Sequence, residues 1–347
     1  MGPATGTSTA TSELVPTGRL GPALVAATGD PRWSDVRAEL ISGGKSNLTF
    51  LLSSPAGEVV LRRPPTGDLL PSAHDMLREA RVQSALAGTP VPTAPIVLAD
   101  PGDLMGIPCY VMGRVRGHVI RDTLPDGFAC TGEERRALSF GFVDTLAAIH
   151  QVDQDAVGLG DYGRPTGFME RQVRRWTGQW EKSRTRDVPE VEELGRRLAA
   201  RIPAQQAATI VHGDYRIDNV VVDPADPGRV NAVLDWELST LGDPLADLGM
   251  LLLFWRHPGE PNVSSLTPGI TQLPGFPGRG EVAERYATAT GTDLGDLAFY
   301  TAFAHFKFAV IAQGVSVRAR AGAMGGQSFG DLDHEVHAVA AAGLALL

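Results

Sequence analysis

The sequence predicts an α+β fold with two lobes, a small antiparallel β-sheet with one main helix followed by a larger, mostly helical lobe. Up to residue 112, short apolar and β-branched runs alternate with Pro, Gly and Asp turns. From residue 131, apolar residues recur at helical spacing, and only three short Val- and Ile-rich runs interrupt them. We expect a flexible tail at 1–20, a β-rich lobe at 21–112, a hinge at 113–117 and a helical lobe at 118–347.

Composition excludes several classes of protein. With 347 residues, 43% hydrophobic and 20% charged, the chain is neither disordered nor a disulfide-stapled mini-protein. The net charge of −9 argues against nucleic acid as the main partner. Two cysteines without a C-x-x-C pairing fit a reducing cytoplasm. The first twenty residues do not resemble a secretory signal, and no apolar run reaches membrane-spanning length, so we expect a cytoplasmic protein. The sequence does not indicate its oligomeric state.

The elements of the first lobe follow from local patterns. Residues 48–53 and 58–62 predict a β-hairpin around a Pro-Ala-Gly turn. Residues 72–86 carry apolar positions at helical spacing and predict a helix. Residues 95–98 and 109–112 predict two further short strands. Together these segments form the small sheet with its helix.

The second lobe begins with a capping box, in which Thr131 and Glu134 mark the start of a helix that runs to about residue 151. A long helical segment, rich in Arg, Glu and Gln, is expected at 168–201. The remaining predictions are strands at 209–212, 220–223 and 230–235, and helices at 245–254, 282–290 and 297–318.

The most informative segment is IVHGDYRIDNVVVD, residues 210–223. Two apolar strands flank a polar stretch, which predicts a tight loop between paired strands that holds Asp214, Asp218 and Asn219 together. A third strand ends at Asp235. One carboxylate able to accept a proton, with an amide oxygen and a second carboxylate able to hold Mg²⁺, suits metal-assisted phosphoryl transfer. The alternative is that these Asp and Asn residues only stabilise turns.

The segments HGDYRIDN, residues 212–219, and LDWELSTLGDPLADLG, residues 234–249, together resemble the catalytic core of the aminoglycoside phosphotransferase and choline kinase-like family. The resemblance covers about residues 35–320 and implies a protein kinase-like fold. It implies that Asp214 is the catalytic base that orients the acceptor hydroxyl, and that Asn219 and Asp235 ligate magnesium.

The same resemblance implies supporting residues. His212 would support the loop, although an acid or base role is the competing interpretation. Asp247 would brace the loop from below, and Asp243 is a candidate to share that task. Lys307 lies among phenylalanines on a predicted helix and is either a snorkelling residue or a substrate contact.

The first lobe is expected to hold ATP. Glycines between two strands let backbone N–H groups approach phosphates, and the candidate residues are Gly43, Gly44, Lys45, Ser46 and Asn47. A plain hairpin turn is the alternative. The Gly-Lys-Ser end of this segment is not a Walker A loop, because that motif needs glycine at position 39, which is Glu39.

The kinase pattern also requires a cation paired with a helical glutamate. Arg62 and Glu79 stand at these places, with Arg63 as a competitor to Arg62 because strand alternation turns one of the two away. An ordinary surface ion pair is the alternative. The resemblance further places adenine against Met112, Gly113 and Val115.

The resemblance therefore implies an ATP- and Mg²⁺-dependent kinase that phosphorylates a hydroxyl of a small molecule. Kinase-like domains found with acyl-CoA dehydrogenases share the most features with this chain, which implies a hydroxyacyl-CoA-like acceptor. Arg-rich segments at 168–201 and 297–320 favour an anionic acceptor slightly. The alternatives are an aminoglycoside phosphotransferase, a regulatory nucleotide-binding pseudokinase, and a metal hydrolase that uses His212, Asp214 and Asp235.

Overall fold

The computed structural model describes residues 14–43, 47–65, 75–260, 269–322 and 331–347. The chain divides into two compact units. Unit 1 comprises Met1–Arg116 with Ala232–Glu237, and unit 2 comprises Gly117–Asn231 with Leu238–Leu347. The short segment Ala232–Glu237 assigns the predicted metal ligand Asp235 to unit 1, although the chain on either side of this segment belongs to unit 2.

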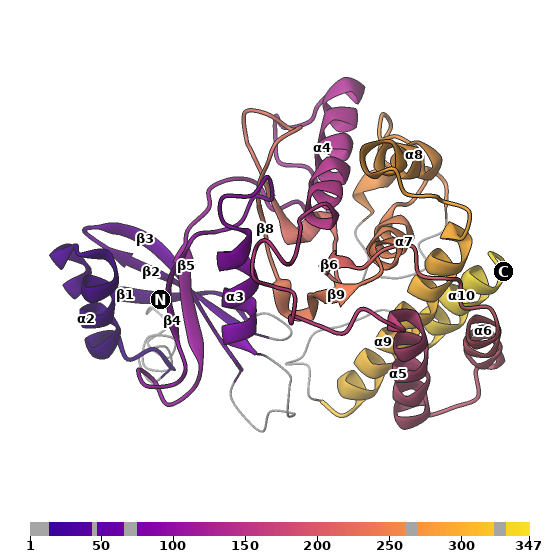
Figure 1. The fold of residues 1–347 in the computed structure, drawn as a ribbon, viewed down its shortest axis with the longest axis horizontal. Coiled ribbons are helices and arrows are strands. Elements are labelled where there is room, and N and C mark those ends of the chain that lie inside the picture. The colour runs from indigo at the N-terminus through magenta and orange to yellow at the C-terminus, as the bar shows by residue number, and fades with distance from the viewer. Residues whose placement is uncertain (1–13, 44–46, 66–74, 261–268, 323–330) are drawn as a thin grey trace, which may run out of the picture. The chain divides into compact units, whose positions relative to one another are not determined.

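Unit 1 is built on a five-stranded antiparallel sheet with the order β1-β2-β3-β5-β4 (Figure 1). This arrangement confirms the predicted sheet, including the hairpin in which β2 and β3 pair from Leu48 opposite Arg63 to Ser54 opposite Gly57. The strands are β1 (Arg37–Gly43), β2 (Leu48–Ser54), β3 (Gly57–Arg63), β4 (Ile96–Asp100) and β5 (Cys109–Gly113).

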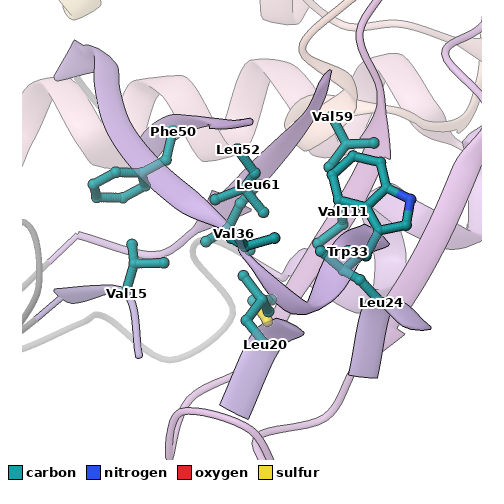
Figure 2. Close-up of a cluster of buried hydrophobic side chains, with 11 residues drawn as sticks. Val15, Leu20, Leu24, Trp33, Val36, Phe50, Leu52, Val59, Leu61 and Val111 are labelled. Carbon is teal, nitrogen blue, oxygen red and sulfur yellow. The ribbon is translucent and has the colours of Figure 1, made fainter. Parts of the chain in front are cut away.

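One face of this sheet is covered by helix α2 (Thr17–Thr28). Leu20 and Leu24 of the helix are fully buried in one cluster with Phe50, Leu61 and other strand residues (Figure 2). Burial of apolar side chains on this scale holds the helix in place. The expected tail at 1–20 is therefore wrong for residues 17–20, which belong to α2; residues 1–13 lie outside the described part of the chain.

The opposite face of the sheet carries a second cluster under helix α3 (Met76–Leu86). Val60, Tyr110 and Met112 point to this face because successive side chains in a strand alternate between the two faces. Asp75 caps the helix by accepting the backbone N–H of Arg78. The predicted helix at 72–86 is confirmed from Met76 onward, and positions 72–74 fall outside the described residues.

Unit 2 is mainly helical, as expected (Figure 1). The predicted capping box is present, with Thr131 and Glu134 bonding reciprocally at the start of the first helix. The helices are α4 (Gly132–His150), α5 (Phe168–Ser183), α6 (Pro189–Ala200), α7 (Pro244–Phe254), α8 (Arg279–Thr290), α9 (Leu297–Arg320) and α10 (Leu332–Leu344). None of the helices in the described ranges is long and apolar enough to cross a membrane.

The single helix predicted at 168–201 is wrong, because the structure has two helices there, α5 and α6. The backbone becomes extended at Arg184, and Pro189 is the first residue of α6. Proline is well tolerated at the first helical position but not inside a helix, because it lacks a backbone N–H. The proline was therefore the sequence signal for the break.

The pairing expected around the polar loop is also wrong. Strand β6 (Thr209–Val211) pairs with β9 (Thr240–Gly242), and β7 (Val220–Val222) pairs with β8 (Val230–Val233). The two strands that flank the loop thus belong to different ladders. A short 3-10 turn at Ile217–Asn219 redirects the chain between them. The loop is held by side chains rather than by a hairpin.

Candidate active site

Arg62 is the central cation of unit 1. Its Nη2 lies 2.9 Å from Oδ1 of Asp235 and 3.4 Å from Oε2 of Glu79. Residue 62 follows Val60 by two positions in β3, so its side chain shares the α3 face of the sheet. Arg63 points to the other face, where it donates to the carbonyls of Pro64 and Leu14. The choice that the sequence left open is settled in favour of Arg62.

Glu79 is buried, with 1% of its side chain exposed. Its carboxylate accepts the hydroxyl of Tyr110 at 3.0 Å and the amide of Asn47 at 3.1 Å. Burial raises the pKa of Glu79 to about 7; the charge of Arg62 opposes this shift, whereas Asp235 and Glu237 add to it. Arg62 and Glu79 therefore belong to a buried polar network and are not an ordinary surface ion pair.

Asp235 lies two residues after β8 and has a left-handed backbone, with φ of 62°. This conformation is unusual for a residue other than glycine and is often found where a side chain has a defined task. The carboxylate remains 30% exposed although it is paired with Arg62. A partly accessible carboxylate, held by one cation, suits a ligand for Mg²⁺.

The expected phosphate loop is described only at its two ends. Gly43 is the last residue of β1, while Gly44, Lys45 and Ser46 lie outside the described residues. Asn47 is 2% exposed, and its side chain donates to Glu79 and, at 3.1 Å, to Glu237. Its side chain thus ties the start of β2 to the charged network, a role that the sequence did not indicate.

The expected adenine contacts lie at the end of β5. Met112 is buried on the α3 face, and Val115 packs against the same cluster. The N–H of Gly113 donates to the carbonyl of Pro95 at 2.8 Å. The Gly113 N–H is therefore already bonded within unit 1, so Gly113 can contact adenine only by accepting a hydrogen bond at its carbonyl oxygen.

In unit 2, the predicted polar loop brings Asp214 and Asn219 together. The side-chain amide nitrogen of Asn219 donates to the backbone carbonyl of Asp214 at 2.9 Å and to its Oδ2 at 3.1 Å. These bonds orient the amide, so that its Oδ1 is the atom left to meet a cation. Arg216 lies beside the same carboxylate, with Nε 3.5 Å from Oδ1 of Asp214, and also pairs with Asp218 at 2.9 Å.

Asp247 on α7 holds the start of this loop. Its carboxylate accepts the backbone N–H of His212 at 2.6 Å and that of Gly213 at 2.8 Å. Burial acts to raise the pKa of Asp247, but the hydrogen bond from His150 and the surrounding donors lower it below the usual value. The carboxylate therefore stays ionised and keeps two backbone donors fixed.

His212 is fully buried, and its Nδ1 accepts the backbone N–H of Asp214 at 3.3 Å. Its position within the loop suits a supporting role. Asp243, proposed to share the task of Asp247, does something else: it caps α7 through the N–H of Leu245 and accepts the hydroxyl of Tyr300 at 2.6 Å.

Several residues of these networks were missed by the sequence reasoning. Tyr110 and Glu237 belong to the network around Arg62. The hydroxyl of Tyr286 is hydrogen-bonded to Nδ1 of His150 at 2.6 Å, and the other ring nitrogen of His150 contacts Asp247. Polar side chains inside apolar segments were the available signal, because such groups are buried only with partners. Their partners are distant in the sequence, so the pattern alone could not supply them.

Comparison with known proteins identifies relatives over most of the chain. The family model described as "Phosphotransferase enzyme family" matches residues 37–300. "Acyl-CoA dehydrogenase family member 11" of Gallus gallus is 37% identical over 316 residues, which are 88% of this chain and 40% of that protein. The chain thus spans about two fifths of the length of this relative. This finding confirms the expected resemblance to kinase-like segments of acyl-CoA dehydrogenase proteins.

Solved structures agree. A Ralstonia eutropha protein, named provisionally as an aminoglycoside phosphotransferase, is 34% identical with a TM-score of 0.81, covering 95% of this chain and 97% of the other. The aminoglycoside phosphotransferase APH(4)-Ia, solved with ADP and hygromycin B, is 18% identical with a TM-score of 0.59, covering 92% and 98%. At that identity the second likeness shows the fold alone. The predicted kinase-like fold is confirmed, and the chain belongs to the phosphotransferase enzyme family.

Proposed function

We propose that this protein transfers the γ-phosphate of ATP to a hydroxyl group of a small molecule. The observation that carries the proposal is the loop in unit 2, where Asp214 is held by Asn219 and the preceding backbone by Asp247. A carboxylate fixed in this way can accept the proton of a bound hydroxyl and direct its oxygen. The acceptor oxygen bonds to the γ-phosphorus, the bond to the β–γ bridging oxygen breaks, and ADP leaves.

Each unit, taken by itself, offers donors of the kind that bind nucleotide phosphates or magnesium. Arg62 offers a buried guanidinium for phosphate oxygens, Asp235 a partly exposed carboxylate, and Asn219 an oriented amide oxygen. When bound, magnesium would neutralise charge on the phosphates. We propose Asn219 and Asp235 as its ligands. The carbonyl of Gly113 and the N–H of Val115 are proposed to bind adenine, beside Met112.

The acceptor is proposed to carry negative charge, as a hydroxyacyl-CoA-like compound does. Two cationic side chains support this proposal: Lys307, whose Nζ donates to the carbonyl of Gly213 next to Asp214, and Arg175, whose charge acts on Lys307. Both also approach the ring of Trp176, Lys307 Nζ at 5.7 Å and Arg175 Cζ at 5.7 Å from its centre. Bringing a polycationic aminoglycoside here would place like charges together, which costs free energy.

Substrate screening tests this proposal directly. ATP consumption with magnesium should be measured against hydroxyacyl-CoA esters, aminoglycosides, choline-like amines and sugars. We expect turnover with an anionic hydroxyl compound. Turnover with aminoglycosides alone would contradict the acceptor class but support phosphotransfer. Nucleotide binding without turnover on any acceptor would favour a regulatory pseudokinase.

The role of Asp214 needs a matched pair of variants. Asp214→Ala should lower kcat by at least about a thousandfold, because orientation and proton acceptance are both lost. Its thermal shift with ATP and Mg²⁺ should match that of the wild type. Asp144→Ala, which removes an exposed carboxylate paired with Arg285 in unit 2, should keep normal turnover. Wild-type turnover by Asp214→Ala would refute the mechanism.

A further inference from the structure

Lys307 is a buried cation whose head group reaches the loop before Asp214. The residue lies within α9 and is only 9% exposed. Its Nζ donates to the backbone carbonyl of Gly213 at 2.7 Å. The N–H of the same glycine donates to Asp247 at 2.8 Å. Both polar backbone groups of Gly213 are therefore held by charged side chains, one from α9 and one from α7.

Gly213 is also a position with little room to move. Its φ is 84°, in the left-handed region, and an added Cβ would lie 2.6 Å from the carbonyl oxygen of Leu238. The backbone there is set by close packing and by the two charged partners. Since Asp214 is the next residue, the direction of its carboxylate depends on this clamped peptide.

Burying a charged group at the position of Lys307 costs free energy. Burial lowers the pKa of Lys307, and the charge of Arg175 on α5 acts in the same direction, whereas the carboxylates of Asp214 and Asp247 oppose the shift. Removing an ammonium from water costs free energy unless other groups compensate. A neutral side chain could donate to a carbonyl at a lower desolvation cost. At this position the ammonium is compensated by the carbonyl of Gly213 and by the charges of Asp214 and Asp247.

We propose that Lys307 is a positioning residue for phosphotransfer, whose ammonium clamps the Gly213 carbonyl and thereby directs the Asp214 carboxylate toward the acceptor hydroxyl. The inference rests on the proposed function and deepens it. Lys307 touches the loop rather than the reacting atoms, so it acts through Asp214. A bond from a charged donor holds the carbonyl more firmly than one from a neutral donor.

The test uses Lys307→Met and Lys307→Gln, with Lys182→Met as a control at an exposed lysine of α5. Steady-state kinetics of Lys307→Met should show kcat lowered at least tenfold, with KM for ATP within twofold of the wild type. Lys307→Gln keeps a hydrogen-bond donor but no charge, and should also lose at least fivefold in kcat. Lys182→Met should match the wild type.

A second readout does not depend on turnover. Hydrogen exchange of the peptide spanning 210–219 should be at least fivefold faster in Lys307→Met than in the wild type, with exchange in unit 1 unchanged. If Lys307→Met fails to fold, Lys307→Gln gives both measurements. A folded Lys307 variant with unchanged exchange at 210–219, or with kcat within twofold, overturns the inference. If the wild type transfers no phosphate to any acceptor, the proposed function fails, and the exchange measurement still decides whether Lys307 positions the loop.

Discussion

Arg62 and Asp235 form an ion pair of 2.9 Å across a sequence separation of 173 residues. The pair lies within unit 1, because the segment Ala232–Glu237 packs with the N-terminal part of the chain. The expected phosphate ligand and one expected magnesium ligand are thus in direct contact with each other. This relationship makes the two residues a natural starting point for experiments.

Replacing Arg62 should weaken nucleotide binding. Arg62→Met removes a buried guanidinium, and charged hydrogen bonds contribute about 1.5–3 kcal/mol, so we expect at least a tenfold rise in Kd for ATP. Isothermal titration with ATP and Mg²⁺ measures this change. Arg63→Met is the matched control, because Arg63 points to the opposite face of the sheet. Equal losses of affinity in both variants would contradict the assignment.

Glu79 should make stability depend on pH. Its folded pKa of about 7 lies above the ordinary glutamate value of 4.5, so the folded protein binds the proton more tightly than the unfolded chain. The resulting stabilisation is complete below about pH 4.5 and is lost as the pH rises through 7. The shift corresponds to about 3 kcal/mol. The difference in free energy of unfolding between wild type and Glu79→Gln, measured by denaturant titration from pH 4.5 to 8, should follow this course.

Replacing Asp247, which holds the start of the polar loop, should lower turnover more than replacing Asp243 does. Asp247→Asn disturbs acceptance of the His212 and Gly213 N–H groups, and we expect about 3 kcal/mol lower stability and at least tenfold lower kcat. Asp243→Asn, whose contacts are the α7 cap and Tyr300, should lose stability but keep kcat within threefold. A larger kcat loss in Asp243→Asn would argue against the brace.

The stabilising contribution of Asp247 has the opposite pH dependence to that of Glu79. Its folded pKa is lowered, so the contribution is present above the unfolded pKa near 3.8 and is lost as the pH falls through the folded value. Acid unfolding of the wild type and Asp247→Asn should converge at low pH. If the stabilities of the two proteins instead fell in parallel down to pH 2, folding would not lower the pKa of Asp247.

Gly213 should tolerate no side chain. Gly213→Ala combines a left-handed backbone with a Cβ 2.6 Å from the Leu238 carbonyl, so we expect a loss of stability of at least about 2 kcal/mol, seen as a lower Tm. Gly291→Ala is the control: its φ of 74° is equally left-handed, but nothing lies within 4 Å of the added Cβ. It should cost only about 1 kcal/mol.

Much of the fold was predictable because local patterns specified it. The hairpin of β2 and β3, the capping box at Thr131 and the helical half of the chain follow from spacing of apolar residues and turn chemistry. Predictions failed where packing or pairing decided the outcome. The tail prediction missed α2, whose Leu20 and Leu24 gain stability only by burial against the sheet.

The candidate site shows the same division. The sequence by itself predicted which residues carry the chemistry, because the types and spacing of Asp214, Asn219 and Asp235 are local properties of the chain. Only the tertiary structure decided which partners they have. Arg62 rather than Arg63 meets Glu79 because β3 alternates its side chains between two covered faces, and Lys307 reaches Gly213 because α9 packs against α7. Contacts between distant segments depend on packing, which a linear pattern does not contain.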